Sequence, residues 1–243
     1  AVITGSSHGL GLVLARGLAE AGAHVVLNGR NEQRLSEAVA ELRNAGLRVH
    51  GYAFDITDAS ALSRQVKAIE ADVGPISILI NNAGVQSRAP ILEMEESVWR
   101  EVLDINLTGA FLTAREVARG MVSRRTGKIV NICSLLSEVG RPTSSPYTAA
   151  KGGLKMLTRA MAVEWARYDI QVNAIGPGYF DTEMNTALVN DPSFDQWIRS
   201  RTPAGRWGRP EELIGAAVFL CSQASSFITG QIIYVDGGVL ASL

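Results

Sequence analysis

The chain has 243 residues, of which 47% are hydrophobic, and its 23 basic side chains nearly balance 24 acidic ones, leaving a formal net charge of -1. A core of this size needs no disulfide or metal to hold it together, and the near-neutral charge argues against nucleic acid or a membrane surface as the main partner. Two cysteines and three scattered histidines exclude a disulfide-rich scaffold and a zinc motif, so no metal is expected.

Short apolar runs recur along the chain, and each has the length of a strand that is buried on both faces. They lie at residues 1–3, 24–27, 48–52, 76–80, 128–132, 170–175 and 231–235. The first run starts abruptly, which indicates that residues before Ala1 are missing.

Stretches with helical spacing of their apolar residues separate these runs. One long helix is marked by Val98, Val102, Ile105, Val117 and Met121. The alternation predicts an α/β fold of the Rossmann type, a doubly wound, seven-stranded parallel sheet in a single domain spanning 1–243.

The segment 182–208 interrupts this alternation with polar, helix-like sequence that contains Pro192 and Pro203. A long connection of this kind is usually functional, so we expect it to cover the substrate site. No apolar stretch reaches the roughly 18–20 residues of a membrane span, and no charged start leads into an apolar segment. The expected compartment is therefore the cytoplasm.

A glycine-rich turn, Thr4-Gly5-Ser6-Ser7-His8-Gly9-Leu10-Gly11, follows the first strand. Glycines there permit a tight turn and a close approach of the backbone to a pyrophosphate. The next helix offers free N–H groups and the positive end of its dipole to a phosphate. An ordinary tight turn would also explain the glycines, but their place in the first strand–helix unit favours a dinucleotide site. We expect cofactor contacts from Gly5, Ser7, His8, Gly9, Leu10 and Gly11.

The end of the second strand selects the nicotinamide cofactor. An acidic residue there binds the ribose 2′-hydroxyl of NAD, whereas an arginine accommodates the 2′-phosphate of NADP. This chain has Asn28-Gly29-Arg30, so Arg30 is the expected 2′-phosphate ligand and His8 is placed to assist. The alternative is that Arg30 is a solvated loop cation. NADP(H) is favoured, with NAD(H) as the alternative.

Acid–base chemistry is predicted for three residues in the second half of the chain. Tyr147 and Lys151 are four residues apart at the start of a helical stretch, so they share one face. A nearby ammonium group, together with an oxidised nicotinamide, stabilises the phenolate and lowers the tyrosine pKa from about 10 toward neutrality. Ser134 ends a buried strand, where ligands bind in open α/β sheets. A surface helix pair is the plainer explanation of the Tyr-x-x-x-Lys spacing alone.

Taken in order, these motifs resemble those of the short-chain dehydrogenase/reductases over essentially the whole chain. The set comprises Thr4-Gly5-x-x-x-Gly9-x-Gly11, Asn81-Asn82-Ala83-Gly84, Asn106, Ser134, Tyr147-x-x-x-Lys151 and Pro177-Gly178. The resemblance implies that Tyr147 is the catalytic acid–base, that Ser134 binds the substrate oxygen and that Lys151 binds the nicotinamide ribose. It also implies that Asn106 holds a water in a proton relay. Further implied cofactor contacts are Asp55 and Ile56 at the adenine, Asn82, Ala83 and Gly84 at the adenosine ribose, and Pro177, Gly178, Tyr179 and Thr182 at the nicotinamide.

Within the family, the chain most resembles the gluconate 5-dehydrogenase group, which implies interconversion of D-gluconate and 5-keto-D-gluconate. The resemblance lies in the stretches 25–31, 131–134, 177–180 and 201–208. Ser87 and Leu136 depart from the residues usual in that group, and both lie near the expected substrate pocket. A homotetramer is implied as well.

A sugar acid needs one cation and several hydrogen-bonding groups around it. Arg88 is the predicted carboxylate ligand, and Ser137 is a predicted substrate contact. Arg141, Gln86 and Glu138 are further candidates, although both arginines also fit a surface or subunit contact. The alternatives in function are a 3-oxoacyl-carrier-protein reductase, another sugar or polyol dehydrogenase, and a non-enzymatic NADP(H) sensor.

Overall fold

A computed structural model describes residues 1–242, except for the side chain of Met184. Its sheet contains seven parallel strands in the order β3-β2-β1-β4-β5-β6-β7. The strand order reverses between β1 and β4, which is where open sheets of this kind bind their ligands. This confirms the predicted α/β, doubly wound architecture. The strands are β1 (Val2–Ile3), β2 (Val25–Gly29), β3 (Val49–Ala53), β4 (Ile78–Asn81), β5 (Gly127–Ile132), β6 (Ile170–Pro177) and β7 (Ile232–Val235).

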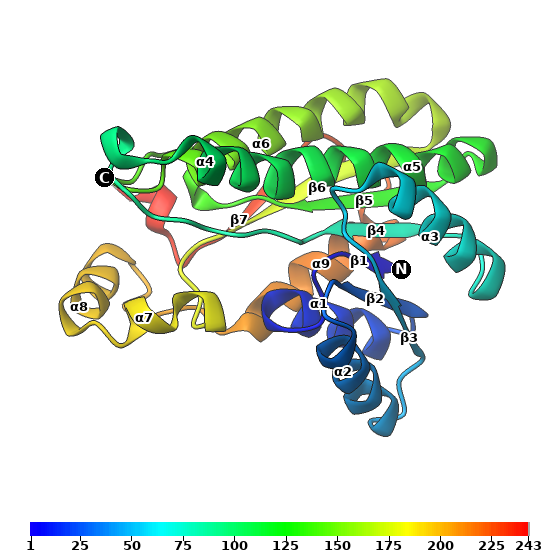
Figure 1. Ribbon diagram of the computed structural model, residues 1–243, viewed down its shortest axis with the longest axis horizontal. Helices are drawn as coiled ribbons and strands as arrows, with labels where there is room; N and C mark the ends of the chain where they lie inside the picture. Colours follow the sequence, from blue (N-terminus) through cyan, green and yellow to red (C-terminus); the bar gives the residue numbers. More distant parts are fainter. Residues whose placement is uncertain (243) are drawn as a thin grey trace.

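Successive side chains of the strands enter two separate cores. Ile3 packs in the core that α1, α2 and α9 cover, whereas its neighbour Val2 packs beneath α3, α5 and α6. Figure 1 shows these two helical layers above and below the sheet. The helices are α1 (Gly9–Glu20), α2 (Glu32–Asn44), α3 (Ala59–Asp72), α4 (Glu96–Leu103), α5 (Gly109–Arg124), α6 (Ser145–Trp165), α7 (Thr186–Val189), α8 (Pro192–Arg201) and α9 (Ile214–Cys221).

A π-helical turn at Asp104–Thr108 joins α4 to α5, within the stretch predicted as one long helix. Asn106 lies in this turn and is 1% exposed. Turns of this kind widen a helix locally and often mark functional sites. The hydrophobic spacing therefore predicts the helix correctly but not the turn that divides it.

The segment 182–208 begins shortly after β6, and its two ends lie side by side. Phe180 and Gly208 form a parallel bridge at its base, and α7 and α8 lie between them. Asp191 begins α8 by accepting hydrogen bonds from the backbone N–H groups of Ser193 and Phe194, with Pro192 next to it in the first turn. In Figure 1 this segment stands apart from the sheet, beside α1. None of the helices in the described part of the chain combines the length and apolar character that a membrane span needs.

Candidate active site

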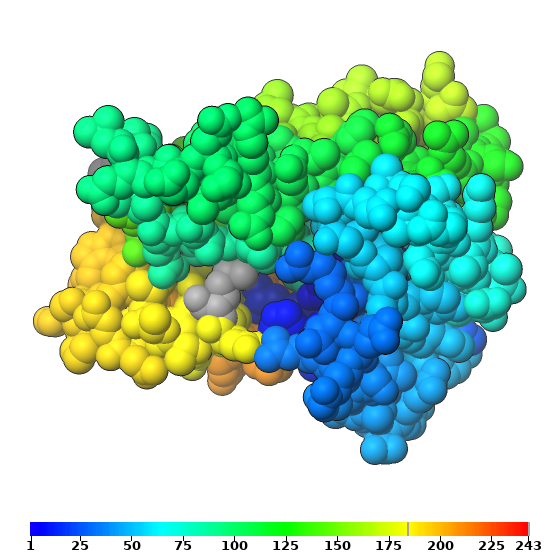
Figure 2. All heavy atoms as spheres, viewed as in Figure 1, coloured from blue at the N-terminus to red at the C-terminus, as the bar shows by residue number. Residues whose placement is uncertain are grey.

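A cavity of about 830 Å³ opens at the carboxyl ends of the strands. In Figure 2 the surface is hollowed between the N-terminal segments, drawn in blue, and the segment 182–208, drawn in yellow. The cavity brings the glycine-rich turn and the Tyr-x-x-x-Lys pair into one space. Its lining includes all four predicted catalytic residues and these predicted cofactor contacts: Gly5, Ser7, His8, Gly9, Leu10, Gly11, Arg30, Asp55, Ile56, Asn82, Ala83, Gly84, Pro177, Gly178, Tyr179 and Thr182.

The glycine-rich turn leaves no room for side chains at its centre. Gly5 has a φ of +60°, and a Cβ added at Gly11 would lie 2.4 Å from both the Gly5 carbonyl oxygen and Asn82 Nδ2. Asn82 Nδ2 donates hydrogen bonds of 2.9 Å to the carbonyls of Thr4 and Gly5, which fixes the turn against the end of β4.

The helix that follows the turn fits an anion. Neither a capping hydrogen bond from the His8 side chain nor an acidic residue in the first turn of α1 satisfies its N–H groups. Unpaired N–H groups and the helix dipole make this end attractive to a phosphate. The site therefore has the features that a dinucleotide pyrophosphate requires.

Arg30 and Asp55 stand at the ends of β2 and β3. Arg30 is exposed, and its Nη1 lies 3.6 Å from Asp55 Oδ2. Burial acts to raise the pKa of Asp55, but the N–H and hydroxyl of Thr57 and the charge of Arg30 outweigh it and lower this pKa. The carboxylate therefore stays ionised and holds Arg30 loosely at the cavity edge.

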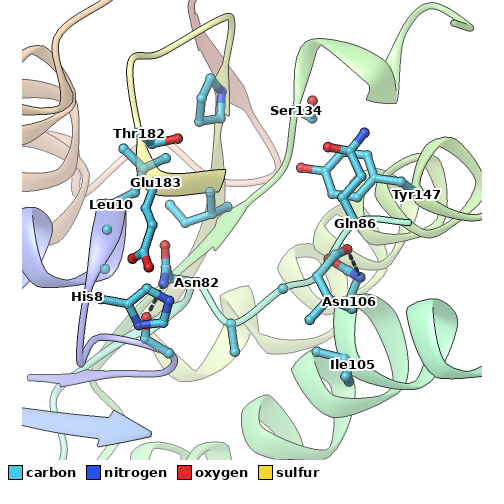
Figure 3. A pocket seen from close by; sticks show the side chains of 18 of the residues that line it. His8, Leu10, Asn82, Gln86, Ile105, Asn106, Ser134, Tyr147, Thr182 and Glu183 are labelled. Carbon is cyan, nitrogen blue, oxygen red and sulfur yellow. Dashed lines mark hydrogen bonds between the residues drawn. The ribbon is translucent and has the colours of Figure 1, made fainter. Parts of the chain in front are cut away.

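The predicted catalytic side chains come from three elements. Tyr147 and Lys151 project from the beginning of α6, and Ser134 follows β5. Lys151 is buried, its Nζ donates a 2.6 Å hydrogen bond to the carbonyl of Ile132, and it lies 5.5 Å from the centre of the Tyr147 ring. Figure 3 shows Ser134, Gln86, Tyr147 and Asn106 on one side of the pocket, with His8, Asn82 and Glu183 on the other.

Burial controls the titration of this pair. Burial raises the pKa of Tyr147 to about 12, against the lowering effects of a hydrogen bond with Ser134 and the charge of Arg88. Burial also lowers the pKa of Lys151 to about 8. Within the chain itself the tyrosine pKa is thus raised, not lowered as the sequence argument expected. A lowering requires a further positive charge, such as that of an oxidised nicotinamide beside the ring.

Asn106 is held by two hydrogen bonds and leaves one polar atom free. Its Nδ2 donates to the carbonyls of Val85 and Val102, both at 2.8 Å. Its buried Oδ1 has no hydrogen-bond partner among residues 1–242, and a Cβ on Gly84 would come within 2.5 Å of it. A buried amide oxygen of this kind is suited to accept a hydrogen bond from a water or a ligand.

The predicted substrate residues occupy different positions. Arg88 lines the cavity, where its Nη2 donates to Gln86 Oε1 at 3.2 Å. Ser137 is not among the described lining residues; its hydroxyl accepts a hydrogen bond from the N–H of Ser134. Glu138 likewise lies outside the lining and accepts from Lys155 and Tyr234. Leu136, one of the two departures from the gluconate 5-dehydrogenase pattern, does line the cavity.

Comparison with known proteins places the chain. A family model described as enoyl-(acyl carrier protein) reductase matches residues 5–240. Gluconate 5-dehydrogenase of Gluconobacter oxydans (strain 621H) is 52% identical to this chain over 243 residues, covering 100% of it and 95% of that protein. The chain belongs to the short-chain dehydrogenase/reductase family.

Two further relatives share its full length. The 2-dehydro-3-deoxy-D-gluconate 5-dehydrogenase of Formosa agariphila is 50% identical over 245 residues, covering 100% of this chain and 93% of that protein. The crystal structure of a gluconate 5-dehydrogenase from Burkholderia cenocepacia J2315 in complex with NADP and tartrate superposes with a TM-score of 0.97 at 49% identity, covering 100% of this chain and 95% of that one. As a member of this family, the chain is an oxidoreductase that acts on a CH–OH group.

Several residues that line the cavity of this short-chain dehydrogenase were not predicted as site residues from the sequence motifs. Asn28 is buried, accepts a hydrogen bond from the Gly5 N–H and donates one to the Phe54 carbonyl, so it ties the turn to β2, on which it lies, and to the end of β3. A polar residue at the end of an apolar strand was the available signal. Arg34 pairs with Glu183 at 3.3 Å, across a separation of 149 residues that no sequence pattern reveals.

Proposed function

We propose that this chain is an NADP(H)-dependent oxidoreductase that interconverts D-gluconate and 5-keto-D-gluconate. The observation that carries the proposal is one cavity that joins a phosphate-binding turn, the Ser134, Tyr147 and Lys151 cluster, and an arginine, Arg88, beside the tyrosine. The names of the relatives described above support the same chemistry at carbon 5 of a sugar acid.

The cofactor proposal rests on the ends of the first two strands. The pyrophosphate would lie against the glycine-rich turn on the side of Gly9, where no atom lies within 4 Å of an added Cβ. Arg30 at the end of β2 is the proposed ligand of the 2′-phosphate, because a guanidinium forms strong charge-assisted hydrogen bonds with phosphate. The related Burkholderia cenocepacia enzyme was crystallised with NADP, which supports the preference.

The side chains of the cluster divide the proton chemistry. Bound NADP(H) supplies or accepts a hydride at the reacting carbon. In the direction of reduction, the Tyr147 hydroxyl donates its proton to the carbonyl oxygen, and the Ser134 hydroxyl donates a hydrogen bond to the same oxygen. The Lys151 ammonium stabilises the resulting phenolate, and Asn106 Oδ1 holds a water that returns the proton to Tyr147.

Residues outside the cluster position the substrate. Arg88 is the proposed ligand of the sugar-acid carboxylate, since it lines the cavity and lies close enough to Tyr147 for its charge to act against the raised pKa of that tyrosine. Ser137 positions Ser134, because the Ser137 hydroxyl accepts a hydrogen bond from the Ser134 N–H. The segment 182–208, which contributes Thr182, Glu183 and Asn185 to the lining, is the proposed cover that excludes water.

A second candidate substrate is 2-dehydro-3-deoxy-D-gluconate, favoured by the 50% identity to the Formosa agariphila enzyme. It shares the carboxylate and the reacting position with 5-keto-D-gluconate. A carrier-protein thioester is the remaining alternative within the family. Such a thioester differs from a sugar acid because it has no free carboxylate near the carbonyl group that is reduced.

Oxidation of NADPH, followed by absorbance, tests the function. L-Sorbose is the matched control because it is the neutral counterpart of 5-keto-D-gluconate, with a hydroxymethyl group in place of the carboxylate. We expect kcat/KM to be at least about tenfold higher for 5-keto-D-gluconate, since a hydrogen-bonded charge contributes about 1.5–3 kcal/mol. Faster turnover of an acetoacetyl thioester, or tight NADPH binding without turnover of any ketone, would contradict the proposal.

The lowered pKa of Lys151 predicts how cofactor binding depends on pH. Below pH 8 the ammonium form dominates and NADPH affinity should be constant; above the Lys151 pKa of about 8 the charge is lost, and affinity should fall by up to about tenfold per pH unit. Fluorescence titration of NADPH between pH 7 and 10 measures this. Lys151→Met should remove the slope, and an unchanged slope in that variant would assign the titration to another group.

Assembly and compartment follow the family resemblance. We propose a homotetramer in the cytoplasm. Phe111 of α5 and Met156 and Val163 of α6 are apolar side chains exposed by 39%, 57% and 83%, which supports a subunit contact along these helices.

A further inference from the structure

Two arginines line the cavity, and no carboxylate of the described residues pairs with either of them. Arg88 and Arg141 both line the cavity. None of the ion pairs found within residues 1–242 includes either side chain. Burial lowers the pKa of Arg88, and repulsion by the nearby charge of Arg141 lowers it further. Unneutralised like charges in one cavity are stabilised by an anion between them.

The loops that carry the two arginines are joined directly. The N–H of Ala89 donates to the Thr143 carbonyl at 3.1 Å, and Gln86 Nε2 donates to Ser144 Oγ at 3.5 Å. Thr143 has a φ of +66°, a conformation that is strained for a β-branched residue and that clusters at functional sites. The backbone around Arg141 is therefore held in a specific shape against the loop of Arg88.

Aromatic side chains of the segment 182–208 support Arg141 from the other side. Its guanidinium carbon lies 4.6 Å from the centre of the Phe194 ring on α8, and the guanidinium is close enough to Tyr179 for its charge to oppose the rise in the Tyr179 pKa that burial causes. Tyr179 in turn packs edge-on against Phe194, Trp197 and Trp207, with ring centres about 6 Å apart. The position of Arg141 thus depends on the segment that covers the cavity.

We propose that Arg141 determines specificity for acids, binding the substrate carboxylate together with Arg88, and that Phe194 positions it for this task. An acid substrate then binds a group that is itself held by the segment 182–208, so it favours the covered form of the site. This inference rests on the proposed function in taking the substrate to be a hydroxy acid. It assigns to Arg141 a contact that a neutral ketose lacks.

Arg141→Met tests the contact, because methionine keeps the apolar stem and removes the charge. The readout is kcat/KM for NADPH-dependent reduction of 5-keto-D-gluconate and of L-sorbose. We expect the acid-to-neutral ratio to fall about 10- to 100-fold, with the L-sorbose value changed less than about threefold. Arg64→Gln on α3, an exposed arginine remote from the cavity, should leave both values unchanged. An equal loss with both substrates, or no loss, would overturn the proposal.

Phe194→Leu and Phe194→Tyr test the positioning role. Leucine removes the ring beneath the guanidinium and should lower the acid-to-neutral ratio about 2- to 30-fold, whereas tyrosine retains a ring and should restore the wild-type ratio. A purely structural role for Phe194 would lower turnover of both ketones together. That result would overturn the positioning claim.

A binding measurement separates this inference from the proposed function. If the wild-type protein reduces neither sugar, tartrate is titrated into the NADP-saturated protein, with tryptophan fluorescence as the signal. Tartrate binding that Arg141→Met weakens at least tenfold would support a carboxylate site even though the gluconate proposal had failed. Equal binding by the two proteins, or no binding by the wild type, would overturn the inference.

Discussion

Replacing Tyr147 with phenylalanine should lower kcat for reduction by about 10²- to 10⁴-fold, the usual contribution of a positioned acid. The change removes one hydroxyl from a side chain that lines the cavity beside Ser134. NADPH should still bind within about threefold of the wild-type affinity, since Lys151 keeps its hydrogen bond to the Ile132 carbonyl. The ring packing is unchanged, so the free energy of unfolding should change by less than about 1 kcal/mol.

Stopped-flow absorbance of NADPH measures the chemical step in this variant, and fluorescence titration measures cofactor affinity. Tyr168→Phe is the matched control, because Tyr168 lies in the short 3₁₀ turn after the far end of α6, beside Arg125 and Arg167, and should leave kcat unchanged. A kcat within tenfold of the wild type for Tyr147→Phe would show that another group donates the proton.

The strands were predictable because each one is apolar on both faces, as Val2 and Ile3 illustrate by packing in opposite cores. The ends of the strands were less predictable. β6 continues through Gly176 and Pro177 because these residues pair with Tyr234 and Val235 of β7, and hydrophobicity does not reveal such pairing. The same holds for the π-helical turn, where Asn106 binds carbonyls on two sides.

The parts of the site that were predictable are those fixed by local sequence. The glycine-rich turn and the Tyr147–Lys151 spacing are short motifs, each on one strand–helix connection. Ser137 and Arg141 depend instead on how loops meet in space. The hydroxyl of Ser137 binds the N–H of Ser134, and Arg141 is presented by the left-handed backbone of Thr143. No feature of the sequence specifies a positive φ at a threonine.

A second large effect is expected from Gly11→Ala, which places a methyl group in the glycine-rich turn. The added Cβ would lie 2.4 Å from the Gly5 carbonyl oxygen and 2.8 Å from Ser6 Cα, both backbone atoms that cannot rotate away. α1 must therefore shift, and Asn82, whose Nδ2 also lies 2.4 Å from the added Cβ, must move from its place against the turn. Overpacking of this kind costs about 1–3 kcal/mol of stability.

The variant should show a Tm lowered by roughly 2–10 °C. A displaced turn also misplaces the cofactor, so kcat/KM for NADPH should fall about 100-fold. Gly215→Ala on α9 is the matched control: no atom lies within 4 Å of its added Cβ, and it should raise the free energy of unfolding by about 0.4–1 kcal/mol. Wild-type NADPH affinity in Gly11→Ala would mean that the turn tolerates the shift. The close packing of α1 on β1 and β4 would then serve the stability of the fold, and the pyrophosphate would be bound without it.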